Sequence, residues 1–414
     1  MTENVATAGT LASFRRRLDL GATWPFVLFA WTSSRLLFLV VGVLSHAYMA
    51  PVRPGGYPRE PSGALNYWAH WDGGWFSAIA QFGYDGSDTL AEPLWPSSAN
   101  FFPLYPMTIR AGTLIGGGPA LWGVLISLAA SLAALYFLYE LSRDLFDAEV
   151  ARAATLSLAF FPTAFFLNAV YSEGLFLATA IGAVWAARVR GDFVLAGALG
   201  CLAAATRNVG VLVLLPLVHE SIRRRRAGAA AWPSLTALAL VPLGLLTYMF
   251  WLWRWSSDPL LFSTVVQRTW GRRLTSPAVT LERAWDGAVN GAHWAAHPIS
   301  VLSVPETNPF WNATETFNLA FLVLLAVLVV GVAVTLPAGL TLYAVAVAAL
   351  PVLTPASVQA LASLPRYFLA AFPVFIFLGV VLARRRVLLA VWLTASTALG
   401  VLFTLFFTTW RWVG

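Results

Sequence analysis

Long apolar runs separated by short charged turns constrain this chain more than any other feature. Runs of about 15 to 24 residues recur along the sequence, and only 11% of the residues are charged, where soluble domains carry about 25%. Runs of this length are typical of membrane-spanning helices, and the short alternating segments of a transmembrane barrel are missing from the sequence. The sequence therefore predicts an all-α polytopic membrane protein.

We expect about eleven spans in a single domain over residues 24–414, preceded by a disordered cytoplasmic tail over residues 1–23. Two long polar loops, at about 47–118 and 256–316, interrupt the spans and are expected to carry short interfacial helices, one of them at 75–82. Residues 101–118 hold two prolines, an arginine and a glycine run, which favours an interfacial or re-entrant segment over a span. The predicted spans cover residues 24–46, 120–141, 153–168, 172–189, 193–206, 209–222, 233–255, 317–335, 339–354, 366–383 and 387–409.

The arginine clusters predict the orientation of these spans. The net charge of +7 is carried by arginine alone, because the chain has no lysine. Positive charge favours the cytoplasmic side, which places residues 15–17, 143–152, 188–190, 223–226 and 384–386 inside and the two long loops outside. Since these clusters flank spans and form no single soluble basic face, the high pI does not indicate a nucleic-acid partner.

Asp72 stands out in the first outer loop. It follows His70 and Trp71 and precedes two glycines and Trp75, a setting in which a carboxylate is held in place and a ring-shaped ligand can stack on an indole. This setting favours a catalytic base. Asp is also a preferred helix N-cap, and a helical pattern follows, so an ordinary capping role stays open.

Ionisable and aromatic side chains converge on the same outer side. A carboxylate with several arginines suits a reaction that needs a base and releases an anionic leaving group, and aromatic rings stack on sugars. Interfacial aromatic belts and loop-tying ion pairs would give the same composition without any ligand. Arg35, deep in the first span, is a further functional candidate, with snorkelling as the alternative. Besides Asp72, the candidate site residues are His70, Trp71, Asp85, Tyr105, Arg110, Tyr171, Glu173, Arg207, Asn208, Arg366 and Tyr367.

Several common site signatures do not occur in the sequence. It has no P-loop, no dinucleotide-binding fingerprint and no Asp-x-Asp pair, and its single cysteine, Cys201, lies in an apolar run. His293 and His297 have helical spacing but lack the glutamate of a zinc-protease motif. We therefore expect no metal site and no cofactor, and a soluble nucleotide-sugar donor is disfavoured.

Six short motifs together resemble the GPI mannosyltransferase II (PIG-V-like) family, specifically its bacterial integral-membrane relatives. The resemblance covers most of the chain, and its specificity comes from the order and spacing of the motifs. They lie at residues 70–76 (HWDGGWF), 83–84, 101–106 (FFPLYP), 160–166 with 171–173, 206–208 and 364–367.

The resemblance implies a bundle like those of GT-C glycosyltransferases and an inverting transfer of a sugar, which in this family is mannose. It further implies a polyprenyl-phosphate-mannose donor, a lipid, glycan or protein acceptor, and an active site on the non-cytoplasmic face of the plasma membrane. Asp72 maps onto the family's catalytic carboxylate, and Arg207 and Arg366 would hold the lipid phosphate.

Two other classes of function compete with this interpretation. A flippase or transporter of lipid-linked sugars would place charged or broken-helix sites near the midplane, whereas the acidic residues here concentrate in outer loops and turns. A structural membrane scaffold would not explain why ionisable residues gather on one face. Surface chemistry is therefore the favoured interpretation.

Overall fold

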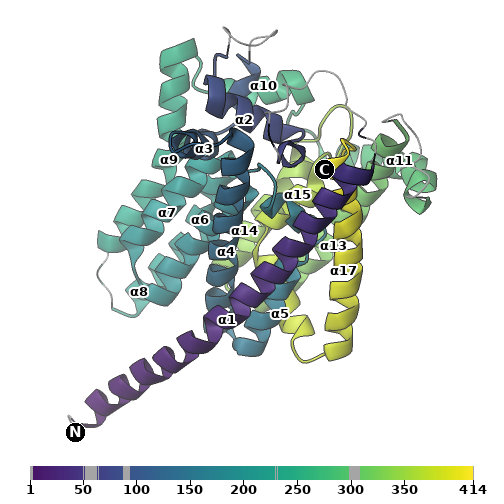
Figure 1. Ribbon diagram of the computed structural model, residues 1–414. Helices are drawn as coiled ribbons and strands as arrows, with labels where there is room; N and C mark the ends of the chain where they lie inside the picture. The colour runs from purple at the N-terminus through teal and green to yellow at the C-terminus, as the bar shows by residue number, and fades with distance from the viewer. Residues whose placement is uncertain are drawn as a thin grey trace.

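The computed structural model describes residues 3–49, 51, 63, 65–86, 94–228, 230, 232–297 and 308–413. Every regular element within these ranges is a helix, which confirms the all-α fold class. The two ends of the chain lie at opposite ends of the bundle (Figure 1).

The α-helices are numbered as in Figure 1. They are α1 (Glu3–Tyr48), α2 (Asp72–Phe82), α3 (Leu104–Thr113), α4 (Pro119–Leu145), α5 (Ala148–Ala159), α6 (Glu173–Trp185), α7 (Phe193–Thr206), α8 (Leu214–Arg226), α9 (Trp232–Ser256), α10 (Leu261–Trp270), α11 (Pro277–Ala296), α13 (Asn308–Thr335), α14 (Ala338–Leu353), α15 (Leu364–Ala370), α16 (Pro373–Leu382) and α17 (Arg386–Thr408). Short 3₁₀ turns lie at Asn66–Trp68, Ser97–Asn100, Ala164–Leu167 and Asn208–Val213, and a π-helical turn lies at Ala186–Arg190.

Five helices among the described residues are long and apolar enough to cross a membrane: α1 from Thr23, α4, α9, α13 and α17. The bent pair α15 and α16, which meet at 81°, would make a sixth. The expected count of about eleven is therefore not confirmed. The other predicted spans correspond to α5, α6, α7, α8 and α14, which have 12 to 16 residues. At 1.5 Å per residue such helices are about 18–24 Å long, shorter than a hydrocarbon core of about 30 Å.

The predicted span at 153–168 is interrupted where α5 ends, and Arg35 of α1 binds the non-helical backbone that follows. Its guanidinium is buried and donates to the carbonyl oxygens of Ala159 and Ala164 at 2.7 and 2.6 Å and to Oδ1 of Asn168 at 2.7 Å. Non-helical backbone at membrane depth must find partners inside the protein, and Arg35 supplies them. This arginine therefore faces protein, as expected for its depth, but its contacts belong to the fold and not to a ligand site.

The polar tail expected to be disordered is helical from Glu3, as the N-terminal part of α1. Alanine, leucine and arginine are among the stronger helix formers, and a tail joined to a stable span extends a helix that is already nucleated.

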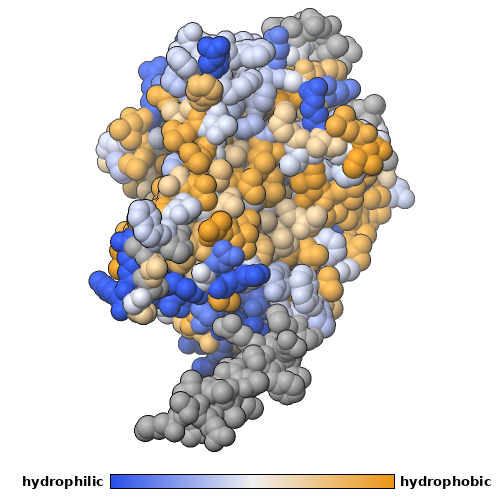
Figure 2. Space-filling view, turned by 90° about the vertical axis from the view of Figure 1, so that its left-hand side faces the viewer, coloured by the Kyte–Doolittle hydropathy of each residue, from blue (hydrophilic) through white to orange (hydrophobic). Residues whose placement is uncertain are grey.

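The surface separates into an apolar band between two hydrophilic ends (Figure 2). Large apolar side chains point outward from the long helices, for example Leu246 and Phe250 of α9 and Val327 and Val330 of α13, each at least 50% exposed. A surface of this kind fits contact with lipid tails. The chain is an integral membrane protein.

The two hydrophilic ends differ in content. α8 finishes and α17 begins at one end of the bundle (Figure 1). This end carries the arginine clusters and ion pairs such as Arg188–Glu220 and Arg384–Asp147, each 2.9 Å. The opposite end carries α2, α3 and α10, together with the segment that follows α17 (Figure 1). This second end holds the cavity described next.

Candidate active site

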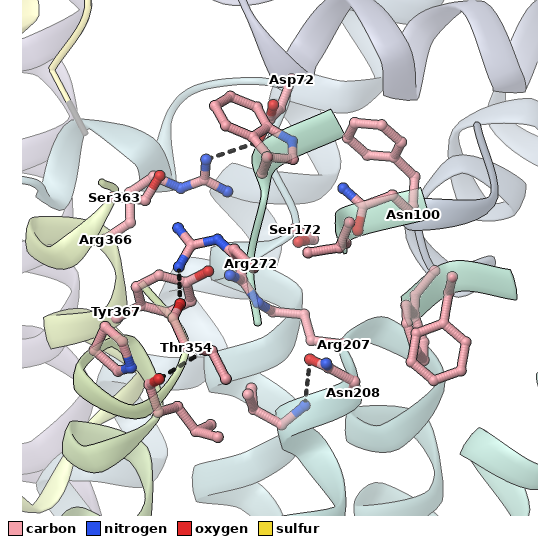
Figure 3. Close-up of a pocket in the computed structure, with 18 of the residues that line it drawn as sticks. Asp72, Asn100, Ser172, Arg207, Asn208, Arg272, Thr354, Ser363, Arg366 and Tyr367 are labelled. Atoms are coloured by element: carbon pink, nitrogen blue, oxygen red, sulfur yellow. Dashed lines mark hydrogen bonds and ion pairs between the residues drawn. The ribbon is translucent and has the colours of Figure 1, made fainter. Parts of the chain in front are cut away.

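A cavity of about 300 Å³ opens at the end of the bundle formed by α2, α3 and α10. Its charged lining consists of Asp72, Arg207, Arg272 and Arg366, so Asp72 is the only carboxylate among the described residues that line it. Figure 3 shows the three guanidinium groups gathered between Asp72 and Asn208. The other lining residues are Phe76, Asn100, Phe101, Phe102, Ser172, Thr206, Asn208, Val209, Phe262, Ser263, Val266, Trp270, Leu350, Pro351, Thr354, Ser363, Tyr367 and Trp412.

Asp72 is the first residue of α2, and its carboxylate faces Arg366. Oδ2 of Asp72 accepts a hydrogen bond from Nη1 of Arg366 at 2.6 Å. The N-cap of this helix is Trp71, and no side-chain cap is present there. Asp72 therefore does not cap α2, in contrast to the capping alternative. Its carboxylate, in the first turn, still interacts favourably with the helix dipole.

The backbone around Asp72 is fixed from several sides. Trp71 has a φ of 57°, unusual for a bulky residue, and its indole is held by edge contacts with Trp410 and Trp412 at centroid distances of 5.4 and 5.0 Å. The Tyr171 hydroxyl accepts from the amide N–H of Asp72 and donates to the carbonyl oxygen of His70, both at 3.2 Å. Such over-determined backbone is characteristic of functional sites.

The glycine after Asp72 has a clear spatial reason. A Cβ atom at Gly73 would lie 3.2 Å from the carbonyl oxygen of Val170 and 3.5 Å from that of Trp68. A Cβ there would crowd the Val170 carbonyl oxygen, so glycine favours the close packing of the start of α2 on the segment before α6. Burial, followed by the nearby Asp72 charge, raises the pKa of Tyr171 well above its usual value, so its phenol stays protonated as a donor.

Behind the cavity wall, Glu173 joins two of the arginines. It lies in the first turn of α6 and is only 3% exposed. Its Oε1 accepts from Nε of Arg366 at 3.0 Å and from Nη1 of Arg207 at 2.5 Å, whereas Oε2 has no hydrogen-bond partner in the described part of the chain. The Arg366 guanidinium also lies over the ring of Tyr171, 4.9 Å from its centroid. Asp72, Arg366, Glu173 and Arg207 thus form one continuous charged network.

Arg272 completes the cavity and was not among the residues selected from the sequence. It follows Gly271, whose φ of 64° ends α10, and its Nη1 and Nη2 donate to the carbonyl oxygens of Thr354 and Ala362 at 2.9 and 2.8 Å. Its guanidinium also lies 5.6 Å from the ring centroid of Tyr367. Trp270 and Trp412, which line the same cavity with ring centroids 6.2 Å apart, were missed as well.

The remaining sequence candidates divide by position. His70 is buried, donates from Nδ1 to the carbonyl oxygen of Phe407 at 2.9 Å and stacks on Trp410 at 4.2 Å. Tyr105 is buried too, and its hydroxyl donates to the carbonyl oxygen of Gly123. Asp85 and Arg110 are exposed and do not line the cavity. The structure therefore brings Asp72, Arg207, Asn208, Arg366 and Tyr367 into the lining, with His70, Trp71, Tyr105, Tyr171 and Glu173 packed behind it.

In such a cavity the carboxylate can accept a proton, while the arginines beside it bind an anion. Within the described ranges, no three His, Cys, Asp or Glu side chains gather as a metal site would require.

Comparison with known proteins confirms the resemblance drawn from the motifs. Residues 54–225 match the family model described as Mannosyltransferase (PIG-V). This range contains Asp72, Glu173 and Arg207, and the match supports a membrane glycosyltransferase. Arg272, Arg366 and Trp412 lie outside the matched range. No curated protein matches the chain in sequence.

Solved structures align with this chain over most of its length, but at low sequence identity and low TM-scores. ArnT from Cupriavidus metallidurans bound to undecaprenyl phosphate aligns with a TM-score of 0.46 and 16% identity, over 88% of this chain and 60% of that one. The archaeal oligosaccharyltransferase AglB from Archaeoglobus fulgidus, in complex with an inhibitory peptide and a dolichol-phosphate, aligns with a TM-score of 0.39 and 13% identity, over 94% of this chain and 56% of that one. The chain thus spans 60% and 56% of the chains in these two structures.

Proposed function

We propose that the protein is an inverting membrane glycosyltransferase that moves a sugar, mannose by family resemblance, from a polyprenyl-phosphate carrier to an acceptor hydroxyl. The observation that carries the proposal is the cavity itself, in which one carboxylate, Asp72, stands among three arginines. Direct displacement with inversion needs one base and a stabilised anionic leaving group, and no second nucleophilic carboxylate.

In the proposed step, the acceptor oxygen bonds to the anomeric carbon of the sugar while the bond from that carbon to the phosphate oxygen breaks. The acceptor proton passes to Asp72, and the electron pair of the broken bond stays on the phosphate. An alcohol is too weakly acidic to attack unaided, and general base catalysis of this kind contributes about 10²–10⁴-fold.

The ion pair between Asp72 and Arg366 supports this role. As Asp72 takes up the proton it loses its negative charge, and the departing phosphate gains one. Arg366, 2.6 Å from Asp72, would then turn from the neutralised carboxyl group to the phosphate, and Arg207 would add a second guanidinium. The total charge around the arginines stays constant through the step, so no further positive group is needed to balance the leaving phosphate.

The arrangement of the two hydrophilic ends supports catalysis on the non-cytoplasmic side. The end of α8 and the start of α17, which carry arginine clusters, lie at the end of the bundle opposite α2 and α10 (Figure 1), whose residues line the cavity. Positive charge favours the cytoplasm. A cavity at one end also differs from the midplane site of most transporters, which argues against a flippase.

The proposal is tested with purified protein, labelled polyprenyl-phosphate-mannose and a membrane lipid extract, followed by identification of the labelled product. We expect a mannosylated acceptor and no product from GDP-mannose when the carrier is omitted. Efficient direct use of GDP-mannose would contradict the proposed donor, and the absence of any sugar transfer would contradict the proposed activity.

A further inference from the structure

The three arginines that line the cavity differ in how many carboxylates offset their positive charge. Arg366 contacts the carboxylates of Asp72 and Glu173, and Arg207 contacts that of Glu173. Arg272 has only neutral partners in the part of the chain that the structure describes, namely two carbonyl oxygens and the ring of Tyr367. Among the three arginines of the lining, Arg272 is therefore the one whose charge no carboxylate of the described residues offsets.

We propose that Arg272 is the first binding residue for the phosphate of the lipid carrier. This inference rests on the proposed function for the identity of the ligand. Arg272 lies outside residues 54–225, the region that matches the family model. Arg366, whose three guanidinium nitrogens all face carboxylates, joins only when Asp72 becomes protonated.

The donors of Arg272 suit this task. A guanidinium has five N–H donors in a fixed fork, and the carbonyl oxygens of Thr354 and Ala362 use two of them. Three donors remain on a group that is already held in place by the segment between α14 and α15. A pre-positioned fork loses little side-chain freedom when it binds a phosphate, which favours affinity.

The charge balance of the site fits a phosphodiester. Three arginines face two carboxylates, Asp72 in the lining and Glu173 behind it, which leaves one positive charge in excess. A sugar linked to a lipid through phosphate carries one negative charge at this position, so its binding would bring the site to neutrality.

Apolar residues near Arg272 favour a lipid source for the phosphate. Leu350 and Pro351 of α14 line the cavity one turn before Thr354, which Arg272 contacts, and Val266 of α10 lines it one turn before Trp270. An isoprenoid chain can pack on such side chains, whereas free phosphate gains nothing from them.

The neighbouring residue provides a matched control. Arg273 is exposed, its side chain has no partner within the described ranges, and it is not part of the lining. Replacing Arg272 or Arg273 by glutamine removes the same charge from adjacent positions. Glutamine at 272 can still donate to a carbonyl oxygen, and Arg272→Lys keeps the charge but loses the fork.

The test measures binding of undecaprenyl phosphate to the full-length protein in detergent, with no sugar transfer involved. We expect Arg272→Gln to weaken binding about ten- to hundredfold, the usual range for a charge-assisted hydrogen bond, and Arg272→Lys to weaken it less. Arg273→Gln should bind like the unmodified protein, and phosphate-free undecaprenol should bind equally to all variants.

Several results would overturn the inference. They are unchanged undecaprenyl phosphate binding in Arg272→Gln, an equal loss of undecaprenol binding, or an equal loss in Arg273→Gln. Competition by inorganic phosphate as strong as that by the lipid would refute the lipid source. If Arg272→Gln does not fold, a well-folded Arg272→Lys with full affinity overturns it instead. Lipid binding without sugar transfer would contradict the proposed function alone.

Discussion

Nη1 of Arg366 lies 2.6 Å from Oδ2 of Asp72, although 294 positions separate the two residues in the chain. This contact joins α15 to the start of α2, in the first long loop of the chain. It brings together a residue inside the region that matches the mannosyltransferase family and one outside it. The base and its arginine partner are therefore products of the whole fold and not of one motif.

Replacing Glu173 by glutamine tests its role as a positioning residue. The buried carboxylate holds Arg207 and Arg366, and its loss leaves their charges poorly balanced. Removing one partner of a buried ion pair costs about 3–5 kcal/mol, so we expect a lower melting temperature together with a raised KM for the donor. Both are measured on the same purified variant.

Glu220 offers a matched control for Glu173. It is also 3% exposed and accepts from two arginines, Arg188 and Arg223, but it lies at the arginine-rich end of the bundle. Glu220→Gln should lower the melting temperature comparably and leave the donor KM unchanged. If Glu173→Gln changes only stability, as this control is expected to do, Glu173 has no positioning role.

Trp412 is expected to contribute to sugar binding. Its indole lines the cavity beside Trp270, and aromatic faces stack on sugar rings. Trp412→Ala should raise the donor KM about three- to tenfold and leave inhibition by the sugar-free carrier unchanged, while Trp412→Phe should retain most of the affinity. Trp253, half exposed on α9, is the control position. Equal weakening of the sugar-free carrier would show that Trp412 acts on the lipid or on the fold.

The proposed orientation is tested by thiol labelling in a Cys201→Ala background. Ile115 and Leu274 are more than 80% exposed near the cavity end, and Val387 is 76% exposed at the start of α17. Cysteine at 115 or 274 should react with an impermeant reagent in intact cells, and cysteine at 387 only after the membrane is opened. The reverse pattern would place the cavity in the cytoplasm.

Much of the site could be predicted from the sequence, because local signals mark it. Charge asymmetry grouped Asp72, Glu173 and Arg207 on one side, and the structure places all three in one network with Arg366. Arg272 lies in the second loop predicted to be outside, but no local feature set it apart from the other arginines of that loop, and Trp412 follows the last predicted span. Their positions in the cavity lining are fixed by contacts with Thr354 and Trp270, respectively, which sequence spacing does not reveal.

The span count could not be predicted for a related reason. Hydropathy measures how apolar a segment is and not whether its helix is continuous. α5 ends at Ala159, shortly before Pro162, and Arg35, distant in sequence, donates to the carbonyl oxygens of Ala159 and Ala164 beside the break. A buried arginine can therefore support a break in a segment that still reads as apolar.

The central claim, that Asp72 is the catalytic base, is tested most directly by the turnover of Asp72→Asn with a saturating lipid-linked donor. Asparagine keeps the size of the side chain and an oxygen that accepts from Arg366, but it cannot take up the acceptor's proton. The account predicts that kcat falls about 10²–10⁴-fold in a folded enzyme that binds undecaprenyl phosphate at least as tightly as the unmodified protein, because the neutral amide leaves Arg366 able to face the phosphate. An Asp72→Asn enzyme with full turnover would contradict it.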